Sequence, residues 1–96
     1  MSPMLRLVVI PLGAIHESGE LHDALARALG FPEWYGRNWD AFWDAITGLV
    51  EMPRKLRFED WRQFEARLPR DAALLRSALV DMAKQYPLQV PKVVYA

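Results

Sequence analysis

Short apolar runs alternate with segments of helical periodicity along this chain of 96 residues, and the alternation limits the folds open to it. The runs lie at residues 6–12, 55–58 and 90–95, and the first is almost continuously apolar and rich in β-branched side chains. Such runs are typical of strands, and we expect the first to be buried on both faces. Strands separated by helices require crossover connections, so the sequence predicts an α/β fold, a small parallel sheet with helices packed against it.

The first helix is expected at residues 20–29. Ser18 is its predicted N-cap, and Gly30 is a suitable end because glycine readily adopts the left-handed conformation that closes a helix. Its apolar side chains recur at helical spacing and form one stripe: Leu21, Leu25, Ala28 and Leu29.

A second helix is expected at residues 39–50, with Asn38 as N-cap and with Gly48 and Pro53 ending it. At ~100° per residue its buried side consists of Trp39, Phe42, Trp43 and Ile46.

Two more helices are expected in the second half, at residues 61–67 and 70–85. Pro69 suits the start of the longer one, because proline is favoured in a first turn, and Pro87 ends it. The apolar stripe of the longer helix consists of Leu74, Leu75, Ala78, Leu79 and Met82.

Length and composition indicate one globular domain over residues 1–96. The absence of cysteine excludes disulfides and thiolate chemistry and fits a reducing compartment. The only early apolar run, at residues 5–14, is too short to span a bilayer and lacks a basic region beyond Arg6. We therefore expect a cytoplasmic protein with no signal peptide and no membrane partner.

Charge is balanced overall, with 12 bases and 12 acids, but it is segregated along the chain. Residues 33–51 hold four acids against one base, Arg37, whereas residues 54–76 hold seven bases against four acids. A neutral protein with an acidic middle is poorly suited to grip phosphate backbones, which requires clustered positive charge. It is better suited to meet a basic partner.

Asp40 and Asp44 lie four residues apart, so their side chains leave one face of the second helix with Cβ atoms about 6 Å apart. Like charges at that spacing disfavour an isolated helix, and Asp44 lies beyond the turn where the helix dipole would help it. Two interpretations stay open: a solvated helix face, or a surface that meets a cationic partner.

Residues 31–36 form a loop that carries aromatic bulk. Trp34 and Tyr35 precede Gly36, which would permit a backbone turn with positive φ. Both rings could fold into the core; this is the simpler interpretation for Tyr35, whereas Trp34 could equally face a partner. Pro32 and Gly36 would hold the loop rigid, and rigidly held loops often carry function.

Little in the sequence indicates an enzyme. Asp40 and Asp44 lack the opposed placement of glycosidase carboxylates, and His16 and His22 have no evident catalytic partner. No serine lies in a nucleophile elbow and no glycine-rich phosphate loop follows a strand. Scattered single carboxylates make no ligand set, so we expect no metal and no cofactor.

An RNA-binding patch is a second hypothesis, because bases are interleaved with Phe58 and Trp61. The simpler interpretation of these bases is the solvated outside of a strand and a short helix. They are Arg54, Lys55, Arg57, Arg62 and Arg67.

The segment from Phe31 to Pro53 closely resembles the barstar family. It reads Phe-Pro-Glu-Trp-Tyr-Gly-Arg-Asn-Trp-Asp-Ala-Phe-Trp-Asp-Ala-Ile-Thr-Gly-Leu-Val-Glu-Met-Pro, a long and specific pattern. The pair Leu21-His22 and the run Trp61-Arg62-Gln63-Phe64-Glu65 extend the likeness, which covers the chain from about residue 5 to its end.

This resemblance implies a three-stranded parallel sheet with about four helices packed on it. It also implies an intracellular inhibitor, not an enzyme, that blocks the active site of a small secreted ribonuclease of the barnase type. The acidic helix and the aromatic loop before it would make the contact. The implied partner is one basic ribonuclease, with no direct nucleic-acid contact and no small-molecule substrate. An alternative is a barstar-like interaction domain whose partner is not a ribonuclease.

The resemblance also assigns roles to single residues. Asp44 would enter the phosphate site of the ribonuclease and imitate the scissile phosphate, and Asp40 would pair with an arginine at its rim. Trp34 stands where the family usually has tyrosine and would pack on the catalytic histidine, so a differently shaped partner is conceivable. Glu51 would add to the acidic field. The other expected partner-binding residues are Gly36, Asn38, Trp39, Trp43 and, as the nearest counterpart of a family acid on the last helix, Asp81.

Overall fold

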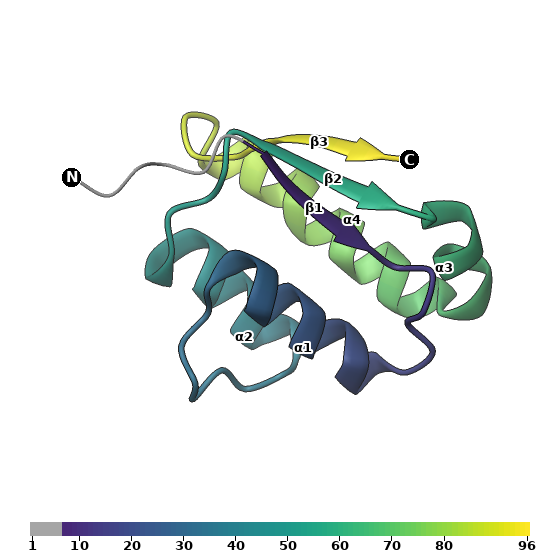
Figure 1. Ribbon diagram of the computed structural model, residues 1–96. Helices are drawn as coiled ribbons and strands as arrows, with labels where there is room; N and C mark the ends of the chain where they lie inside the picture. Colours follow the sequence, from purple (N-terminus) through teal and green to yellow (C-terminus); the bar gives the residue numbers. More distant parts are fainter. Residues whose placement is uncertain (1–6) are drawn as a thin grey trace.

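Three parallel strands form the sheet of the computed structural model, which describes residues 7–96 (Figure 1). They are β1 (Leu7–Pro11), β2 (Lys55–Glu59) and β3 (Lys92–Tyr95), and they lie in the order β1-β2-β3. Leu7 pairs with Lys55, and Lys55 pairs with Lys92. The predicted parallel α/β fold is confirmed. Arg6, which was expected to begin the first strand, lies outside the described residues.

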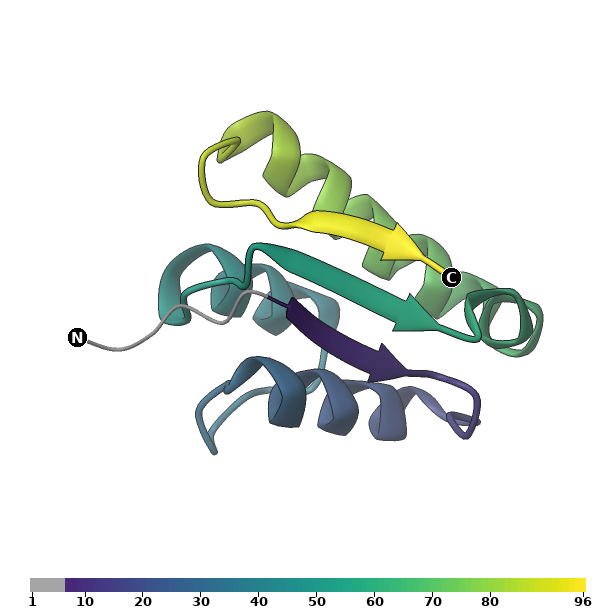
Figure 2. The same ribbon diagram turned by 45° about the horizontal axis from the view of Figure 1, so that its top comes forward.

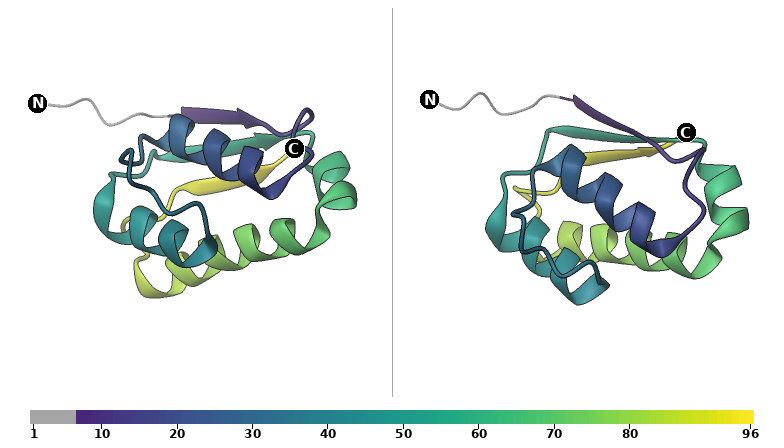
Figure 3. Two further views of the ribbon diagram at one scale, coloured as in Figure 1. Left: turned by 90° about the horizontal axis from the view of Figure 1, so that it is seen from below. Right: turned by 60° about the horizontal axis from the view of Figure 1, so that its bottom comes forward.

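The helices cover one face of this sheet (Figures 1 and 3). Helices α1, α2 and α4 run beneath it, while α3 lies beyond the carboxyl ends of the strands (Figure 2). In chain order the helical elements are α1 (Ser18–Leu29), α2 (Trp39–Asp44), the π-helical turn η1 (Ala45–Leu49), α3 (Trp61–Arg67) and α4 (Pro69–Gln85). Within residues 7–96, none of these helices combines the length and apolar character needed to cross a bilayer.

The other face of the sheet is open, and this corrects the prediction that the first strand is buried on both sides. In β1, Val8 and Ile10 point into the core, whereas Leu7 and Val9 are 52% and 41% exposed. The register places Leu7 beside Lys55 and Val9 beside Arg57 on this open face. The apolar run could not reveal this, because its outward positions are as hydrophobic as its inward ones.

Helix α1 begins two residues earlier than predicted, and Glu17, not Ser18, is its N-cap. The Glu20 carboxylate accepts hydrogen bonds from the backbone N–H groups of His16 and Glu17, at 2.9 and 3.1 Å. That bond pattern satisfies donors that a helix start leaves free. Gly30 ends the helix in the left-handed conformation with φ 75°, as predicted.

The second helix begins as predicted and changes pitch before it ends. The Asn38 side chain accepts a hydrogen bond from the Ala41 N–H at 2.7 Å, which is the predicted cap. The last turn, η1, is π-helical, and the Val50 N–H donates to the Ala45 carbonyl at 3.1 Å. Its buried side chains are Phe42, Ala45 and Ile46, while Trp39 and Trp43 are only half-buried.

The remaining elements lie close to their predicted bounds, although β3 starts at Lys92, two residues later than expected. Arg67, at the end of α3, donates hydrogen bonds to the carbonyl oxygens of Leu12 and Gly13 at 2.8–3.2 Å. This guanidinium therefore fastens α3 to the turn after β1.

Candidate functional site

Asp40 and Asp44 are exposed on the outer side of α2, whose inner side is anchored in the core by Phe42. Residues 7–96 form two ion pairs, Arg37–Asp23 and Arg57–Glu59, and neither helix aspartate takes part in them. Both carboxylates therefore face solvent from a fixed helix. Glu51, just after η1, is also exposed.

Trp34 carries the most exposed aromatic ring of residues 7–96, with 71% of its surface accessible. Its neighbour Tyr35 is 9% exposed and packs into the core, where its ring lies 4.8 Å from that of Phe31. The Tyr35 N–H donates to the Pro32 carbonyl at 3.0 Å and closes the turn. The loop thus places one aromatic ring inside and one outside. We call the exposed set Trp34, Asp40, Asp44 and Glu51 the acidic–aromatic surface.

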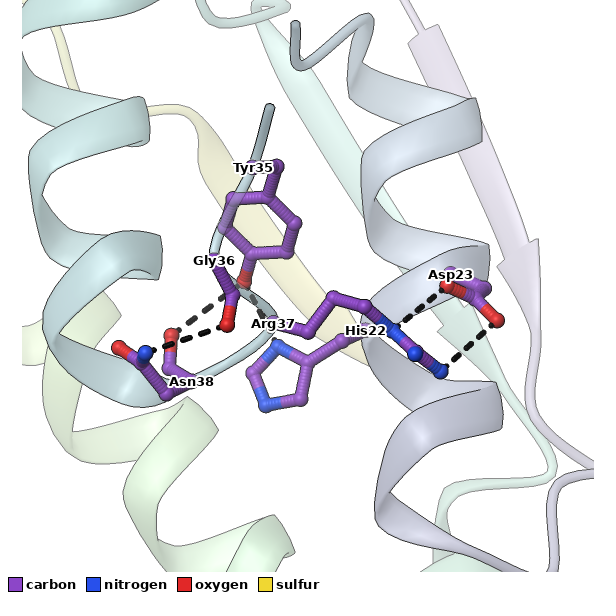
Figure 4. Close-up of polar contacts among 6 residues, drawn as sticks. All are labelled: His22, Asp23, Tyr35, Gly36, Arg37 and Asn38. Atoms are coloured by element: carbon purple, nitrogen blue, oxygen red, sulfur yellow. Dashed lines mark hydrogen bonds and ion pairs between the residues drawn. The ribbon is translucent and has the colours of Figure 1, made fainter. Parts of the chain in front are cut away.

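A buried histidine fastens this loop from below. His22 on α1 is 1% exposed, and its Nδ1 atom lies 2.7 Å from the Tyr35 hydroxyl (Figure 4). The hydroxyl donates a longer hydrogen bond, 3.5 Å, to the Asn38 carbonyl. Burial lowers the pKa of His22 below 6.5 and raises the pKa of Tyr35, so both groups are neutral near pH 7.

The positive φ expected at Gly36 falls instead on Arg37, with φ 53°. The Arg37 guanidinium forms a two-pronged contact with the Asp23 carboxylate at 3.0 and 3.2 Å (Figure 4). Gly36 does not have a positive φ, but a side chain at this position would be crowded. A Cβ atom there would come within 3.3 Å of Ala41 Cβ and of Asn38 Nδ2.

Trp39 and Trp43 contribute more to packing than to exposed area. The Trp39 ring lies 4.6 Å from the His22 ring, and its Nε1 donates to Asp71 Oδ1 at 3.1 Å. The Trp43 ring lies 6.3 Å from that of Tyr86. Both indoles therefore pack against neighbouring elements and help to fix the position of α2, while part of each side chain stays accessible.

The other expected binding residues are all accessible. Gly36 and Asn38 are exposed at the end of the loop, and Asp81 is exposed on α4. Sequence reasoning missed the supporting roles of His22 and Asp71. One signal for His22 was available, because it lies three and seven residues before Leu25 and Leu29 and therefore on the buried stripe of α1.

A groove of about 740 Å³ adjoins this surface, and Glu51 belongs to both. One side is lined by η1 and the segment after it, which include Leu49 and Glu51, and the other by the loop before β3, which includes Leu88. Leu49 is 45% exposed and Leu88 is 99% exposed.

The arrangement of residues 7–96 gives little support to a metal site or to an RNA-binding patch. Residues 7–96 contain no group of three or more His, Cys, Asp or Glu side chains placed to hold a metal ion. Phe58 and Trp61, the rings of the hypothetical RNA patch, are 0% and 5% exposed and cannot stack on bases without leaving the core. Arg57 pairs with Glu59, and Arg67 is bonded to backbone carbonyls.

Comparison with known proteins agrees with this geometry. The family model described as "Barstar (barnase inhibitor)" matches residues 5–95. A Bacillus subtilis (strain 168) protein named "Putative ribonuclease inhibitor YrdF" is 56% identical over 36 residues. That alignment covers 38% of this chain and 40% of the relative's length. Because the family model spans nearly all the described residues and the sheet has the expected parallel order, this chain belongs to the barstar family.

Proposed function

We propose that this chain inhibits a small, basic ribonuclease by covering its active site with the acidic–aromatic surface. One observation carries the proposal: Asp40 and Asp44 project from one helix into solvent, and the ion pairs of residues 7–96 include neither of them. A folded protein gains nothing from two like charges at this spacing, whereas a cationic partner gives them a role.

The chemistry of ribonucleases explains why such a surface would inhibit. An enzyme that cleaves RNA must hold a phosphate and stabilise the charge that develops on it, so its cleft presents fixed positive groups. In the proposed complex the Asp44 carboxylate satisfies those groups in place of the scissile phosphate, and it offers no bond to cleave. Asp40 pairs with an arginine at the rim of the same cleft.

Aromatic and small residues complete the proposed contact. Trp34 supplies an amphipathic ring that stacks on the catalytic histidine of the enzyme. The contact is framed by Trp39, Trp43, Gly36 and Asn38, and Glu51 and Asp81 extend it. The exposed acids also attract a basic protein from a distance and thereby speed its encounter.

The complex contains one inhibitor and one ribonuclease and forms in the cytoplasm of the cell that makes both. It needs no cofactor and no metal, and the inhibitor does not itself touch RNA. It is a reversible protein–protein interaction and not an enzymatic reaction.

Barnase, the ribonuclease named in the family description, is the first probe. We expect stoichiometric addition of the chain to stop barnase from cleaving a fluorogenic RNA. Replacing both Asp40 and Asp44 by alanine should abolish that inhibition, whereas the control Glu65→Ala, an exposed acid on α3, should leave it intact. If the wild-type chain binds a basic protein from its source cell that has no RNA-cleaving activity, the partner is not a ribonuclease and the proposal is wrong.

A further inference from the structure

The loop that carries Trp34 contacts α1 through a buried imidazole as well as through the exposed Arg37–Asp23 ion pair. His22 projects from α1 and meets Tyr35 of the loop at 2.7 Å, and Tyr35 in turn reaches the Asn38 carbonyl at the start of α2 (Figure 4). Trp39 packs on the same imidazole with its ring 4.6 Å away. One side chain therefore contacts both the middle of the loop and the helix that presents the aspartates.

We propose that His22 is a positioning residue for the partner-binding surface: its neutral ring holds the loop through Tyr35, and its protonation loosens the loop and weakens partner binding. The second half of this statement rests on the proposed inhibitor function, whereas the first half concerns the free protein alone.

The surroundings of the ring oppose a positive charge. His22 is 1% exposed, and three charged groups act on it: Asp71 from α4, Arg37 from the loop and Asp23 from its own helix. Tyr35 and Trp39 meet the ring from the loop and from α2 and are uncharged. Asp71 favours the cation, but its Oδ1 already accepts from Trp39 and Ser18, and Arg37 disfavours the cation. Burial outweighs the two carboxylates and lowers the pKa of His22.

Protonation also changes the hydrogen bonding available to the loop. The Tyr35 hydroxyl has one proton, so beside a neutral ring it either donates to Nδ1, or accepts from Nδ1 and donates to the Asn38 carbonyl. In the imidazolium both nitrogens donate, so the Tyr35 hydroxyl must accept and can donate only toward the Asn38 carbonyl, 3.5 Å away. We therefore expect the charged ring either to be hydrated by an entering water molecule or to shift toward the Asp71 carboxylate. Either change would displace the Tyr35 side chain and with it the loop.

A titration of the free protein tests the first half of the proposal. Nuclear magnetic resonance would follow the His22 ring and backbone amides between about pH 5 and 8. We expect the amides of Trp34, Tyr35 and Gly36 to shift with the midpoint of His22, while those of Val8 and Leu56 in the sheet stay in place. The exposed His16 is the only other histidine, and His16→Gln assigns the signals and serves as the control. The proposal would be overturned if the chemical shifts of the loop amides did not change with the midpoint of His22. It would also be overturned if those of the sheet amides changed with it.

Affinity for barnase tests the second half. Asparagine places a polar atom near the Nδ1 position but takes up no proton in this range, so His22→Asn provides a reference whose affinity does not depend on the charge at position 22. At lower pH the wild type should lose affinity relative to His22→Asn, by at most tenfold per pH unit, because its histidine must be deprotonated to bind. Tyr35→Phe should bind about three- to tenfold more weakly at every pH, since it removes the hydrogen bond but keeps the ring.

The ratio of wild-type to variant affinity cancels any titration of barnase itself. A ratio for His22→Asn that does not change with pH would refute the proposed link to binding. If the chain fails to bind barnase at all, the proposed function fails with that probe, and the titration of the free protein still decides whether His22 positions the loop.

Discussion

The indole Nε1 of Trp39 lies 3.1 Å from Oδ1 of Asp71 and donates a hydrogen bond to it. Trp39 is the first residue of α2, and Asp71 lies in the first turn of α4. The same oxygen accepts a longer hydrogen bond, 3.4 Å, from the Ser18 hydroxyl at the start of α1. One carboxylate thus connects the starts of three helices that are far apart in the sequence.

Asp71→Ala should therefore destabilise the fold. We expect the free energy of unfolding to fall by about 1–3 kcal/mol, because the half-buried Trp39 N–H loses its acceptor. Asp71→Asn, which can keep an acceptor oxygen in place, should lose less. Urea unfolding monitored by tryptophan fluorescence measures both variants, and equal stability of Asp71→Ala and wild type would show that the bond contributes nothing.

Asp44→Ala should weaken inhibition of the ribonuclease and leave the fold intact. Removing one partner of a buried interfacial charge pair costs about 2–5 kcal/mol, a range taken from measured complexes that include barnase–barstar and not from this structure. Stability should change by no more than about 0.5 kcal/mol, because Asp44 is exposed. The inhibition constant of Asp44→Ala is compared with that of the control Glu65→Ala. Equal constants would show that Asp44 does not contribute to binding.

Arg37 combines an unfavourable backbone conformation with a solvent-exposed ion pair. Its φ is 53°, and the side chains of Arg37 and Asp23 are 54% and 52% exposed. We expect Arg37→Gly to be more stable than Arg37→Ala by about 1 kcal/mol, because only glycine accepts a left-handed φ without cost. Both variants lose the ion pair, which at this exposure contributes less than about 1 kcal/mol. Thermal unfolding measures the stability of both variants. If the alanine variant were as stable as the glycine variant, the positive φ at this position would carry no energetic cost.

The stability of the folded chain should decrease as the pH falls below about 6.5. The pKa of His22 is lower in the folded protein than its ordinary value of 6.5, so between those two values the unfolded chain binds more protons. The contribution of His22 is therefore constant above about pH 6.5 and becomes more destabilising down to its folded-state pKa. Urea unfolding of wild type and His22→Asn at a series of pH values isolates this contribution. Parallel profiles would mean that His22 titrates alike in both states.

Direct binding to RNA should be absent. Phe58 and Trp61 are buried, and the nearby Arg57 and Arg67 already contact Glu59 and backbone carbonyls. A gel-shift experiment with single-stranded RNA at low salt and about 10 µM protein should show no complex. A complex whose affinity falls steeply as salt is added would support the RNA-binding hypothesis instead.

Most of the architecture could be predicted from local patterns. The apolar stripes of α1 and α4, the Asn38 cap and the Gly30 end all follow from contacts within one or two helical turns. The exposed placement of Asp40 and Asp44 follows from the same helical geometry. These features depend on neighbours in the sequence, and such neighbours are visible in it.

The missed features depend on contacts between distant segments or on choices that local sequence leaves open. The His22–Tyr35 contact joins residues 13 apart, and the Trp39–Asp71 contact joins residues 32 apart. The exposed side of β1 depends on where the helices pack, which an apolar run does not record. The positive φ lies at Arg37, although glycine at position 36 would have adopted the angle more easily, and the local sequence does not determine which of the two residues takes it.

The open face of the sheet offers a place from which to observe binding. Val9 is 41% exposed there, on the side away from α2, and the sequence contains no cysteine (Figure 1). A single cysteine introduced at Val9 would be the only thiol and could carry a fluorescent dye on a rigid strand. The dye would report the slower tumbling of a complex without lying between the acidic–aromatic surface and the proposed partner.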